Sequence, residues 1–368
     1  MKHLVLVGGG HSHLAVLKSL GDAPAKGVRL TLLSPRRHTL YSGMIPGLIA
    51  GHYRPEDCRI DLRPLAARTD GRFIQDSAAG VDPVRREVIT AGGGRLIYDL
   101  LSLDIGSTSG EPARVSRHAL PFRPVEGFLA GWERLREAGR RGEVRRIAVV
   151  GGGAGGVEVL LAMQHALAGA SVEFALFCDT RILAGHNESV RHRIGCILGE
   201  RGVAVRTGQR VVAVREDGLE LEGGEGFDAQ ATVWATGAGS HAWISESGLA
   251  TDPRGFVAVS DTLQSLSHPE VFAAGDCATV IGDSRPKSGV MAVRQGPILA
   301  GNLRLALAGA SPKPFRAPAR ALALISCGDR YAVASWASLA LEGAWVWRCK
   351  DCIDRRFVQR YRLGGTGD

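Results

Sequence analysis

The 368-residue sequence predicts an α/β protein with two parallel-sheet units and a further C-terminal segment. Apolar, strand-like runs are followed twice by glycine turns, at residues 8–10 and 151–156. A helix pattern and a second strand-like run follow each turn, which is the order of a βαβ unit. The chain is 45% hydrophobic and has 49 glycines. That composition supports packed cores and is not typical of a low-complexity chain.

The first unit begins at the amino terminus. Residues 3–7 (HLVLV) predict a strand, residues 11–20 a helix and residues 28–34 (VRLTLLS) a second strand. Gly8 and Gly10 fit the first two positions of the G-x-G-x-x-G fingerprint, and His13 stands at the third. The glycines therefore lie in the context that a dinucleotide-binding turn requires, with one unusual member.

The second unit carries a complete fingerprint. Residues 145–150 predict a strand, and Gly151, Gly153 and Gly156 follow at the required spacing before a helix pattern and another strand. The first glycine makes the bend, the second admits a pyrophosphate and the third lets the helix pack on the strand. Phosphates then meet the amides of the helix N-terminus. Two such units predict two dinucleotides, and the usual chemistry of that pair is hydride transfer from a nicotinamide to a flavin.

Together these motifs resemble the pyridine nucleotide-disulfide oxidoreductase superfamily, and within it the type II NADH dehydrogenases. The segments YSGMIPGLIAGHY (41–53), LISCGDRYAVAS (324–335) and EGAWVWRCKDCIDRRF (342–357) are similar to a flavoprotein module that some bacteria fuse to selenide, water dikinase. No dikinase domain is present in this sequence. The resemblance implies two Rossmann-type domains, one for FAD and one for NAD(P)H.

The same resemblance assigns roles to four further motifs. DLLSLDIGS (99–107), with Gly106, and TVWATGA (232–238), with Gly237, are similar to the segments that close the two nucleotide units. HPEVFAAGDCA (268–278) is similar to a second flavin motif, in which Gly275 admits the backbone and Asp276 binds the ribityl chain. VMAVRQGPILAGNL (290–303) is similar to a helix that begins beneath the isoalloxazine.

From these motifs we take two candidate catalytic side chains. Glu158 follows from the GGVE that the family places near the nicotinamide, and Gln295 lies on the helix expected beneath the flavin. The implied FAD domain is split into residues 1–110 and 240–318. The implied NAD(P)H domain covers residues 111–239, and residues 319–368 form a C-terminal interface segment.

Both units depart from the usual acidic residue that holds a ribose diol about 20 residues after the glycines. In the first unit that position is Ser34, whose hydroxyl can bond a ribose more weakly than a carboxylate can. In the second unit Asp179 comes one or two residues late, after Cys178, and Arg181 follows. The pattern favours NADH and leaves NADPH open, since Arg181 could serve a 2′-phosphate or be a solvated surface residue.

Two histidines in the first turn allow different interpretations. The His13 imidazole could donate to the flavin pyrophosphate, or it could be a packed side chain held by a backbone carbonyl. We expect His11 to face solvent or a loop. Neither histidine belongs to a set of metal ligands, so we expect no metal site.

The cysteine pattern bears on the electron acceptor. Disulfide reductases of the superfamily carry a C-x-x-x-x-C pair where this chain reads RHTLYSGMIPGLIAGHY (37–53), which has no cysteine. Cys349 and Cys352 form the single C-x-x-C, without the strand-to-helix context of a redox motif. The seven cysteines are scattered, which favours a reducing compartment over a disulfide framework.

The last 50 residues favour an interfacial segment. Apolar residues recur there at helical spacing, although Arg356 and Arg360 interrupt them; they are Trp345, Cys349, Ile353 and Phe357. Trp336, Trp345 and Trp347 beside arginines are typical of a segment that lies at a lipid headgroup surface. The alternative is a helix that covers the flavin or the seam of a homodimer. A net charge of +8 also favours anionic partners such as phosphates or a membrane surface.

We therefore expect an FAD-dependent NAD(P)H oxidoreductase that passes electrons from the flavin to a small acceptor, a quinone by resemblance. The alternatives are a reductase of selenium or sulfur compounds and a non-catalytic, redox-sensing flavoprotein. We expect no nucleic-acid partner. Without a signal peptide or a spanning run of apolar residues, the sequence predicts a cytoplasmic protein that could lie on the inner face of the membrane.

Overall fold

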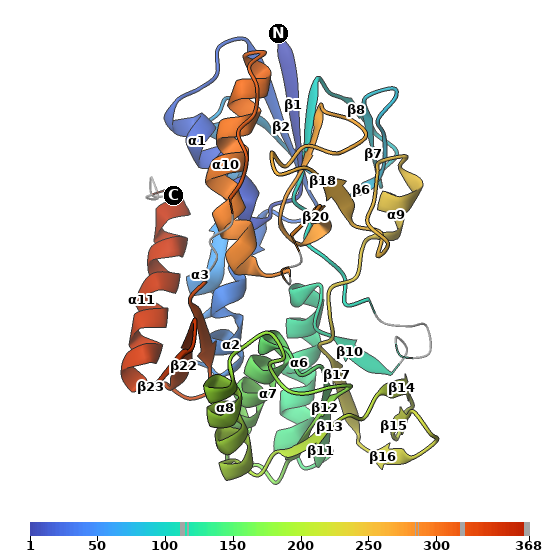
Figure 1. Ribbon diagram of the computed structural model, residues 1–368, viewed down its shortest axis with the longest axis vertical. Helices are drawn as coiled ribbons and strands as arrows, with labels where there is room; N and C mark the ends of the chain where they lie inside the picture. Colours follow the sequence, from blue (N-terminus) through green and yellow to red (C-terminus); the bar gives the residue numbers. More distant parts are fainter. Residues whose placement is uncertain (111–114, 116–117, 284, 286, 317–320, 364–368) are drawn as a thin grey trace.

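The computed structural model describes residues 1–110, 115, 118–283, 285, 287–316 and 321–363. Two five-stranded parallel sheets form the centres of two units, which lie one above the other in Figure 1. Helices cover both sheets, so each unit is a Rossmann-like α/β domain, as the sequence predicts.

The first sheet has the strand order β19-β9-β1-β2-β5. Its strands are β1 (Lys2–Val7), β2 (Val28–Ser34), β5 (Arg72–Gln75), β9 (Leu100–Leu103) and β19 (Val271–Ala273). Helix α1 (His11–Asp22) follows β1 and packs closely on α10 (Gly289–Leu307). A Cβ atom on Gly296 would overlap the side chain of Ala15, so the absence of a side chain there permits this close packing. Strand β19 comes from beyond the second unit and returns to the first sheet.

The second sheet has the order β10-β17-β11-β12-β13. Its strands are β10 (Ala119–Pro121), β11 (Arg146–Val150), β12 (Glu173–Cys178), β13 (Ala204–Thr207) and β17 (Ala231–Trp234). Among the described residues, the helices of this unit are α6 (Val125–Arg140), α7 (Ala154–Ala166) and α8 (Glu188–Glu200). The strand, turn, helix and strand of both units therefore lie within a few residues of their predicted positions.

Smaller elements decorate these units. Two antiparallel sheets are formed by β6 (Ala78–Asp82), β7 (Glu87–Thr90) and β8 (Arg95–Ile97), and by β14 (Val211–Val214), β15 (Gly218–Leu221) and β16 (Gly226–Asp228). Two strand pairs join β3 (His38–Leu40) to β4 (Arg59–Asp61) and β18 (Val257–Val259) to β20 (Ala278–Val280). The short helices are η1 (Ser42–Met44), α2 (Ile45–Ile49), α3 (Pro55–Cys58), α4 (Leu62–Ala67), α9 (Ala242–Glu246) and η2 (Gly275–Cys277).

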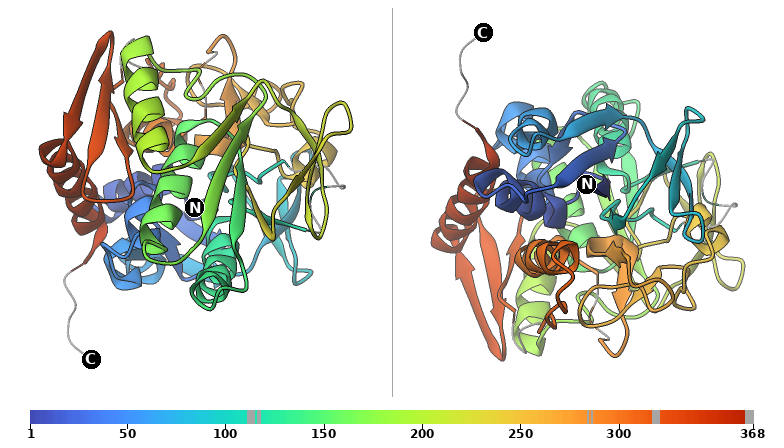
Figure 2. Two further views of the ribbon diagram at one scale, coloured as in Figure 1. Left: turned by 90° about the horizontal axis from the view of Figure 1, so that it is seen from below. Right: turned by 90° about the horizontal axis from the view of Figure 1, so that it is seen from above.

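The C-terminal segment forms a three-stranded antiparallel sheet followed by one long helix. The elements are β21 (Ala323–Ser326), β22 (Ala332–Trp336), β23 (Leu339–Gly343) and α11 (Ala344–Tyr361). Figure 2 shows this sheet and helix along one outer edge of the molecule. Strand β21 contacts α7 of the second unit, and α11 contacts η1 and β4 of the first. The segment therefore joins the two units on one side.

The predicted apolar stripe of this helix is wrong in part. Trp345 and Ile353 are about half exposed, but Phe357 is buried and stacks on Tyr41 with ring centroids 4.2 Å apart. Trp347 is also buried, so it does not belong to an exposed aromatic group. Helix α11 thus has one face packed against the two units and another face that carries exposed apolar residues.

The domain boundaries stay predictions. The expected boundary between residues 110 and 111 meets the described chain on one side only, because residues 111–114 lie outside it. The boundary between residues 318 and 319 lies wholly outside the described residues.

Candidate active site

The first glycine turn brings β1, α1 and the end of β9 together. Gly8 has a φ of +95°, and a Cβ there would overlap the carbonyl group of Asp104. A Cβ on Gly10 would overlap the Asp104 carboxyl group. Both predicted glycines are therefore required by close approach of the segment that follows β9, as well as by any ligand.

Asp104 is the functional candidate that the sequence reading missed. It is 2% exposed, and its Oδ2 accepts hydrogen bonds from the backbone amides of Ser12 at 2.7 Å and His13 at 3.0 Å. Burial raises the pKa of this carboxyl to about 7, against the lowering effect of the two amides. The available signal was an acidic residue directly after a buried strand and two positions before Gly106.

The structure corrects one interpretation of His13. Its Nδ1 lies 2.7 Å from the Gly8 carbonyl oxygen and its Nε2 lies 2.8 Å from Oγ of Ser102. Burial lowers the pKa of His13 to about 4, so the ring is neutral at pH 7. These contacts match a packed histidine and do not fit a charged donor to a pyrophosphate.

We expected His11 to face solvent or a loop, and in the structure it lies against a loop and two aromatic rings. Its ring lies edge-on to Tyr41 and Phe357, with centroids 5.3 and 5.8 Å away. Burial lowers its pKa to about 4. His11 therefore packs between the first turn, the loop after β3 and α11.

The second glycine turn has the same backbone contacts as the first, but the space beside its middle glycine, Gly153, is empty. Gly151 has a φ of +133°, and a Cβ there would overlap the Ala235 carbonyl. A Cβ on Gly156 would overlap the carbonyl oxygen of Gly151, so this glycine lets α7 pack against the turn. A Cβ on Gly153 would meet no atom within 4 Å, and the same is true of Gly237. This arrangement leaves room for a ligand beside the start of α7.

The two candidate ribose-binding positions differ in exposure. Ser34 ends β2, is buried, and donates its hydroxyl to the carbonyl of Arg36 at 3.1 Å. Asp179 directly follows β12 and is exposed, as is Arg181. The side chain of Asp179 is therefore accessible to a ligand, whereas Ser34 already has a partner within the chain.

Asp276 and Gln295 meet at a small hollow of about 100 Å³, which Gly275, Ser288 and Met291 also line. Gly275 has a φ of +68°, and its amide donates to Oε1 of Gln295 at 2.7 Å. This contact makes Gln295 a support for the turn that presents Asp276. The Asp276 carboxylate lies 3.4 Å from the Ser107 hydroxyl and 3.6 Å from the Arg123 guanidinium, beside Gly106, which has a φ of +70°.

Glu158, on α7, points toward the C-terminal segment. Its Oε1 accepts a hydrogen bond from the amide of Ser326 at 2.9 Å. Removal from water raises the pKa of Glu158 to about 7, and the nearby charge of Lys350 acts in the opposite direction. A carboxyl with this pKa can hold or release a proton near neutral pH.

A second buried polar group lies next to Glu158. Nζ of Lys350 donates to Oδ2 of Asp354 at 2.6 Å and to the carbonyl of Gly43 at 2.5 Å. Asp354 is 4% exposed and also hydrogen-bonds Tyr41. We call Glu158, Lys350, Asp354 and Tyr41 the acidic–basic cluster. Its members come from the second unit, the first unit and α11, so tertiary structure alone assembles it.

The seven cysteines are all free, and they lie in the part of the chain that the structure describes. Burial raises the pKa of Cys58, Cys277 and Cys327 to about 12, so these thiols are poor nucleophiles. Cys349 and Cys352 are exposed on the outer face of α11. Among the described residues no group of three or more histidine, cysteine or acidic side chains could hold a metal ion.

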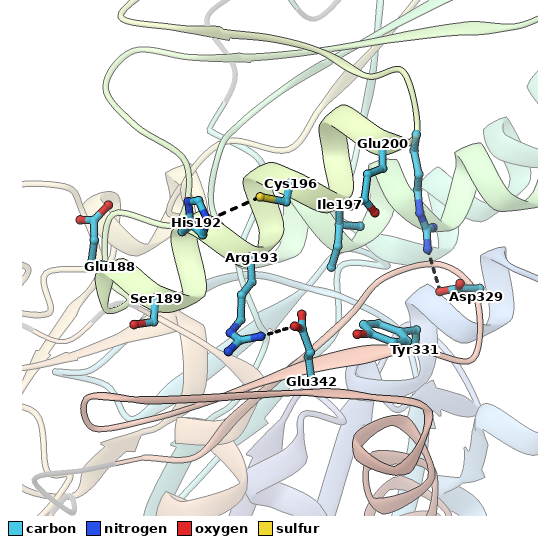
Figure 3. A pocket seen from close by; sticks show the side chains of 11 residues that line it. Glu188, Ser189, His192, Arg193, Cys196, Ile197, Glu200, Asp329, Tyr331 and Glu342 are labelled. Carbon is cyan, nitrogen blue, oxygen red and sulfur yellow. Dashed lines mark hydrogen bonds and ion pairs between the residues drawn. The ribbon is translucent and has the colours of Figure 1, made fainter.

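A groove of about 800 Å³ lies between α8 and the β22–β23 hairpin. Figure 3 shows its mixed lining, in which Arg193 pairs with Glu342 and the Cys196 thiol lies 3.7 Å from the His192 ring. None of its lining residues belongs to either glycine turn or to the acidic–basic cluster. Within the described ranges, no helix combines the length and apolar character that crossing a bilayer requires.

Comparison with known proteins identifies the family of this chain. The family model described as pyridine nucleotide-disulphide oxidoreductase matches residues 2–296. A probable NADH dehydrogenase of Dictyostelium discoideum is 23% identical over 85% of this chain and 76% of its own. An NADH dehydrogenase-like protein of Mycobacterium tuberculosis is 28% identical over 65% of this chain and 63% of its own. The type II NADH:quinone oxidoreductase of Haemophilus influenzae is 25% identical over 76% of this chain and 74% of its own.

Solved structures show the same fold. The sulfide:quinone oxidoreductase of Aquifex aeolicus aligns with a TM-score of 0.83 at 19% identity, covering 98% of this chain and 92% of that one. The NDH2 of Plasmodium falciparum, in complex with NADH, aligns with a TM-score of 0.80 at 14% identity, covering 97% and 98%.

The raised pKa of Glu158 predicts how stability depends on pH. The folded protein keeps this proton above the pH at which the unfolded chain loses it, so the free energy of unfolding should fall between about pH 4.5 and about pH 7. Glu158→Gln keeps the acceptor for Ser326 and cannot ionise. Relative to the wild type it should gain at most about 3 kcal/mol across that range.

Urea unfolding at a series of pH values measures this difference. Glu137→Gln, on an exposed position of α6, is the matched control and should follow the wild-type profile. If Glu158→Gln and the wild type change in parallel with pH, the carboxyl is ionised in the folded protein and the prediction is wrong.

Proposed function

The chain belongs to the pyridine nucleotide-disulphide oxidoreductase family, and we propose that it is an NAD(P)H dehydrogenase that reduces a quinone. The family is FAD-dependent and uses a nicotinamide nucleotide. When bound, FAD accepts a hydride from the nicotinamide and passes electrons to the acceptor. The residues of this chain decide where the two nucleotides bind and how protons reach the acceptor.

The two turns fit the two nucleotides. In the first unit Gly8, Gly10 and the start of α1 form a backbone cradle, and Gly275 brings Asp276 beside Gly106 for the flavin chain. The turn at Gly151–Gly156 has an open centre at Gly153 and an accessible Asp179, which suits NADH. We assign FAD to the first unit and NADH to the second, with NADPH still open because Arg181 is also accessible.

The acidic–basic cluster is the observation that carries the choice of acceptor. Quinone reduction consumes two electrons and two protons, of which NADH brings both electrons and one proton as hydride. The second proton must come from water through the protein. Glu158 has a pKa near neutral pH and lies beside the Lys350–Asp354–Tyr41 hydrogen bonds. We propose that this cluster carries protons to the acceptor. Glu158, on α7 of the unit assigned to NADH, holds the proton on that side of the cluster.

The other acceptors fit less well. A disulfide acceptor needs a reactive thiol pair, and segment 37–53 has none. Sulfur or selenium chemistry needs a thiolate, whereas burial raises the pKa of Cys58, Cys277 and Cys327 far above neutral. The relatives named above include a type II NADH:quinone oxidoreductase, which supports the quinone. A non-catalytic flavoprotein would be reduced by NADH without turning over.

An acceptor screen on the purified protein tests the proposal. We expect about one bound FAD per chain and continuous NADH oxidation with a soluble quinone, much faster than with disulfides or selenite. Cys349→Ser with Cys352→Ser should leave that rate unchanged. Reduction of the flavin without turnover on any quinone would contradict the proposed function, and loss of turnover in the double cysteine variant would favour sulfur chemistry.

Two substitutions should separate the nucleotide sites. Gly153→Val places a branched side chain where the pyrophosphate of NADH approaches, so KM for NADH should rise at least tenfold with FAD retained. Asp276→Ala should release much of the FAD without affecting NADH binding to the second unit. Flavin absorbance and steady-state kinetics measure both. The opposite pattern would mean that the two turns are assigned the wrong way round.

We also propose that the C-terminal edge of the molecule binds an anionic membrane surface, where quinones are found. Large apolar side chains at least half exposed gather there, and we call them the C-terminal apolar patch: Trp336, Leu339, Leu341, Trp345 and Ile353. Arg348 and Arg356 are exposed on the same helix. Exposed aromatic rings beside cations are typical of binding at the headgroup level.

Substitutions in the C-terminal apolar patch test this membrane proposal. They leave Lys350 and Asp354 in place, whereas a truncation would remove both. Trp336→Gln with Trp345→Gln should reduce co-sedimentation with anionic vesicles at least severalfold, while soluble-quinone turnover stays normal. Ile97→Gln, at an exposed apolar position on β8, is the control. Salt should weaken binding of the wild type, because charge attraction is screened within about 10 Å at 0.1 M. No binding by the wild type, or a homodimer sealed by the patch, would contradict the proposal.

A further inference from the structure

The two glycine turns are built alike, and one position differs between them in charge. The Gly8 amide donates to the carbonyl of Leu33 and the Gly151 amide donates to that of Phe177, both at 2.8 Å. A Cβ on Gly8 would overlap the Asp104 carbonyl, and one on Gly151 would overlap the Ala235 carbonyl. Asp104 in the first unit therefore takes the place of Ala235 in the second.

This replacement puts a carboxylate at the start of α1. Asp104 accepts from the amides of Ser12 and His13, which belong to the first turn of that helix. A nucleotide pyrophosphate is held in this fold by the same end of the helix. In the second unit Ala235 offers no charge there, and the space at Gly153 is open. The first unit alone thus has a buried acid where an anionic ligand must approach.

The other groups that face Asp104 do not neutralise it. Asp276 and the Cys277 thiol lie on η2, and the negative charge of Asp276 disfavours ionisation of Asp104. The His13 ring is turned toward Gly8 and Ser102. Arg123 pairs with Asp276 at 3.6 Å. Among the described residues, the main partners of the Asp104 carboxylate are backbone amides.

Three further titratable side chains lie near this turn: Lys287, His11 and His241, whose pKa is lowered by burial and which bonds the backbone at Ile105 and Gly106. Lys287 lies nearer to Cys277 and Asp276, and its Nζ donates to the carbonyl of Ala278 at 2.5 Å. His11 is neutral at pH 7 because burial lowers its pKa to about 4. His11 is therefore uncharged and Lys287 bonds a carbonyl, so a second anion brought to α1 adds to the charge of Asp104.

We propose that Asp104 couples FAD binding to the uptake of one proton, which its carboxyl holds while the pyrophosphate lies at the start of α1. The proposal rests on the assignment of FAD to the first unit. A protonated carboxyl removes the repulsion between two anions at one helix end. It also leaves Asp104 able to donate its proton to a phosphate oxygen or a backbone carbonyl.

The expected pH dependence follows from the free protein. Burial raises the pKa of Asp104 to about 7 in the absence of the cofactor, and a bound pyrophosphate raises it further. Below about pH 7 the carboxyl already holds its proton, so FAD affinity is independent of pH. Above it, each pH unit should weaken FAD binding about tenfold until the carboxyl of the complex itself ionises. FAD does not change charge across this range.

The experiment measures FAD release from the diluted holoprotein by flavin fluorescence, from about pH 6 to about pH 8.5. In parallel, calorimetry of FAD rebinding in buffers of different ionisation enthalpy counts protons. We expect proton uptake near zero at the low end and near one per FAD at the high end. The wild-type measurement needs no variant, so a folding defect cannot obscure it.

Asp104→Asn assigns the proton to this residue. The amide keeps the shape of the carboxyl and cannot ionise, so its FAD affinity should be flat with pH and should exceed that of the wild type at about pH 8.5. Asp104→Ala copies the second unit and should also be flat. Asp276→Asn is the control: it should bind FAD more weakly but keep a slope, beginning at lower pH because the charge that raises the Asp104 pKa is gone.

Different failures have different meanings. A wild-type FAD affinity that is flat with pH, or a slope that persists in Asp104→Asn, would overturn the proposal. A wild-type protein that binds no FAD at any pH would instead overturn the proposed function.

Discussion

The rest of each unit depends on one close backbone contact at its glycine turn. The glycine that follows β1 or β11 packs against the carbonyl of the residue that follows a neighbouring parallel strand. Gly8 meets Asp104 in this way, and Gly151 meets Ala235. Both glycines have positive φ, and a Cβ on either would overlap that carbonyl. Because the turn is so tight, the helix that follows begins with its amides directed at the carboxyl edge of the sheet. The proposed nucleotide sites therefore depend first on backbone geometry.

The C-terminal segment joins the two Rossmann-like units along one side. Strand β21 presents the Ser326 amide to Glu158 of α7, and α11 places Lys350 and Asp354 against the loop after β3. The loop occupies the part of the chain where disulfide reductases of the superfamily carry their thiols. Here that region contributes Tyr41 and the Gly43 carbonyl to hydrogen bonds with α11. The same helix exposes apolar side chains on its other face.

Electrostatics distinguishes the two units more than shape does. The start of α7 is open and faces no acidic side chain from the Ala235 position, whereas the start of α1 already binds the Asp104 carboxylate. Burial favours the protonated forms of Asp104 and Glu158, and both pKa values are raised to about 7. Two carboxyls with pKa values raised to about 7 thus lie at the start of α1 and beside the C-terminal segment.

The sequence by itself determined the local units. The strands at 2–7, 28–34 and 146–150, the glycine turns and the helices after them follow from hydrophobic period and from the conformational freedom of glycine, which act over a few residues. The positions of Gly151, Gly153 and Gly156 could be read from spacing alone. Asp276 and Gln295 came from resemblance, and the structure brings them to one hollow.

Only the tertiary structure decided which side chains meet across the chain. Asp104 looks like an ordinary residue at a strand end until the parallel pairing of β1 with β9 sets it against α1. His13 was ambiguous because one of its two partners, Ser102, is brought beside it only by that pairing, whereas Gly8 belongs to the same turn. Phe357 and Trp347 face inward because α11 packs on two units at once, which a helical period cannot reveal. Contacts between residues hundreds of positions apart depend on how the sheets and helices dock, and no local pattern records that.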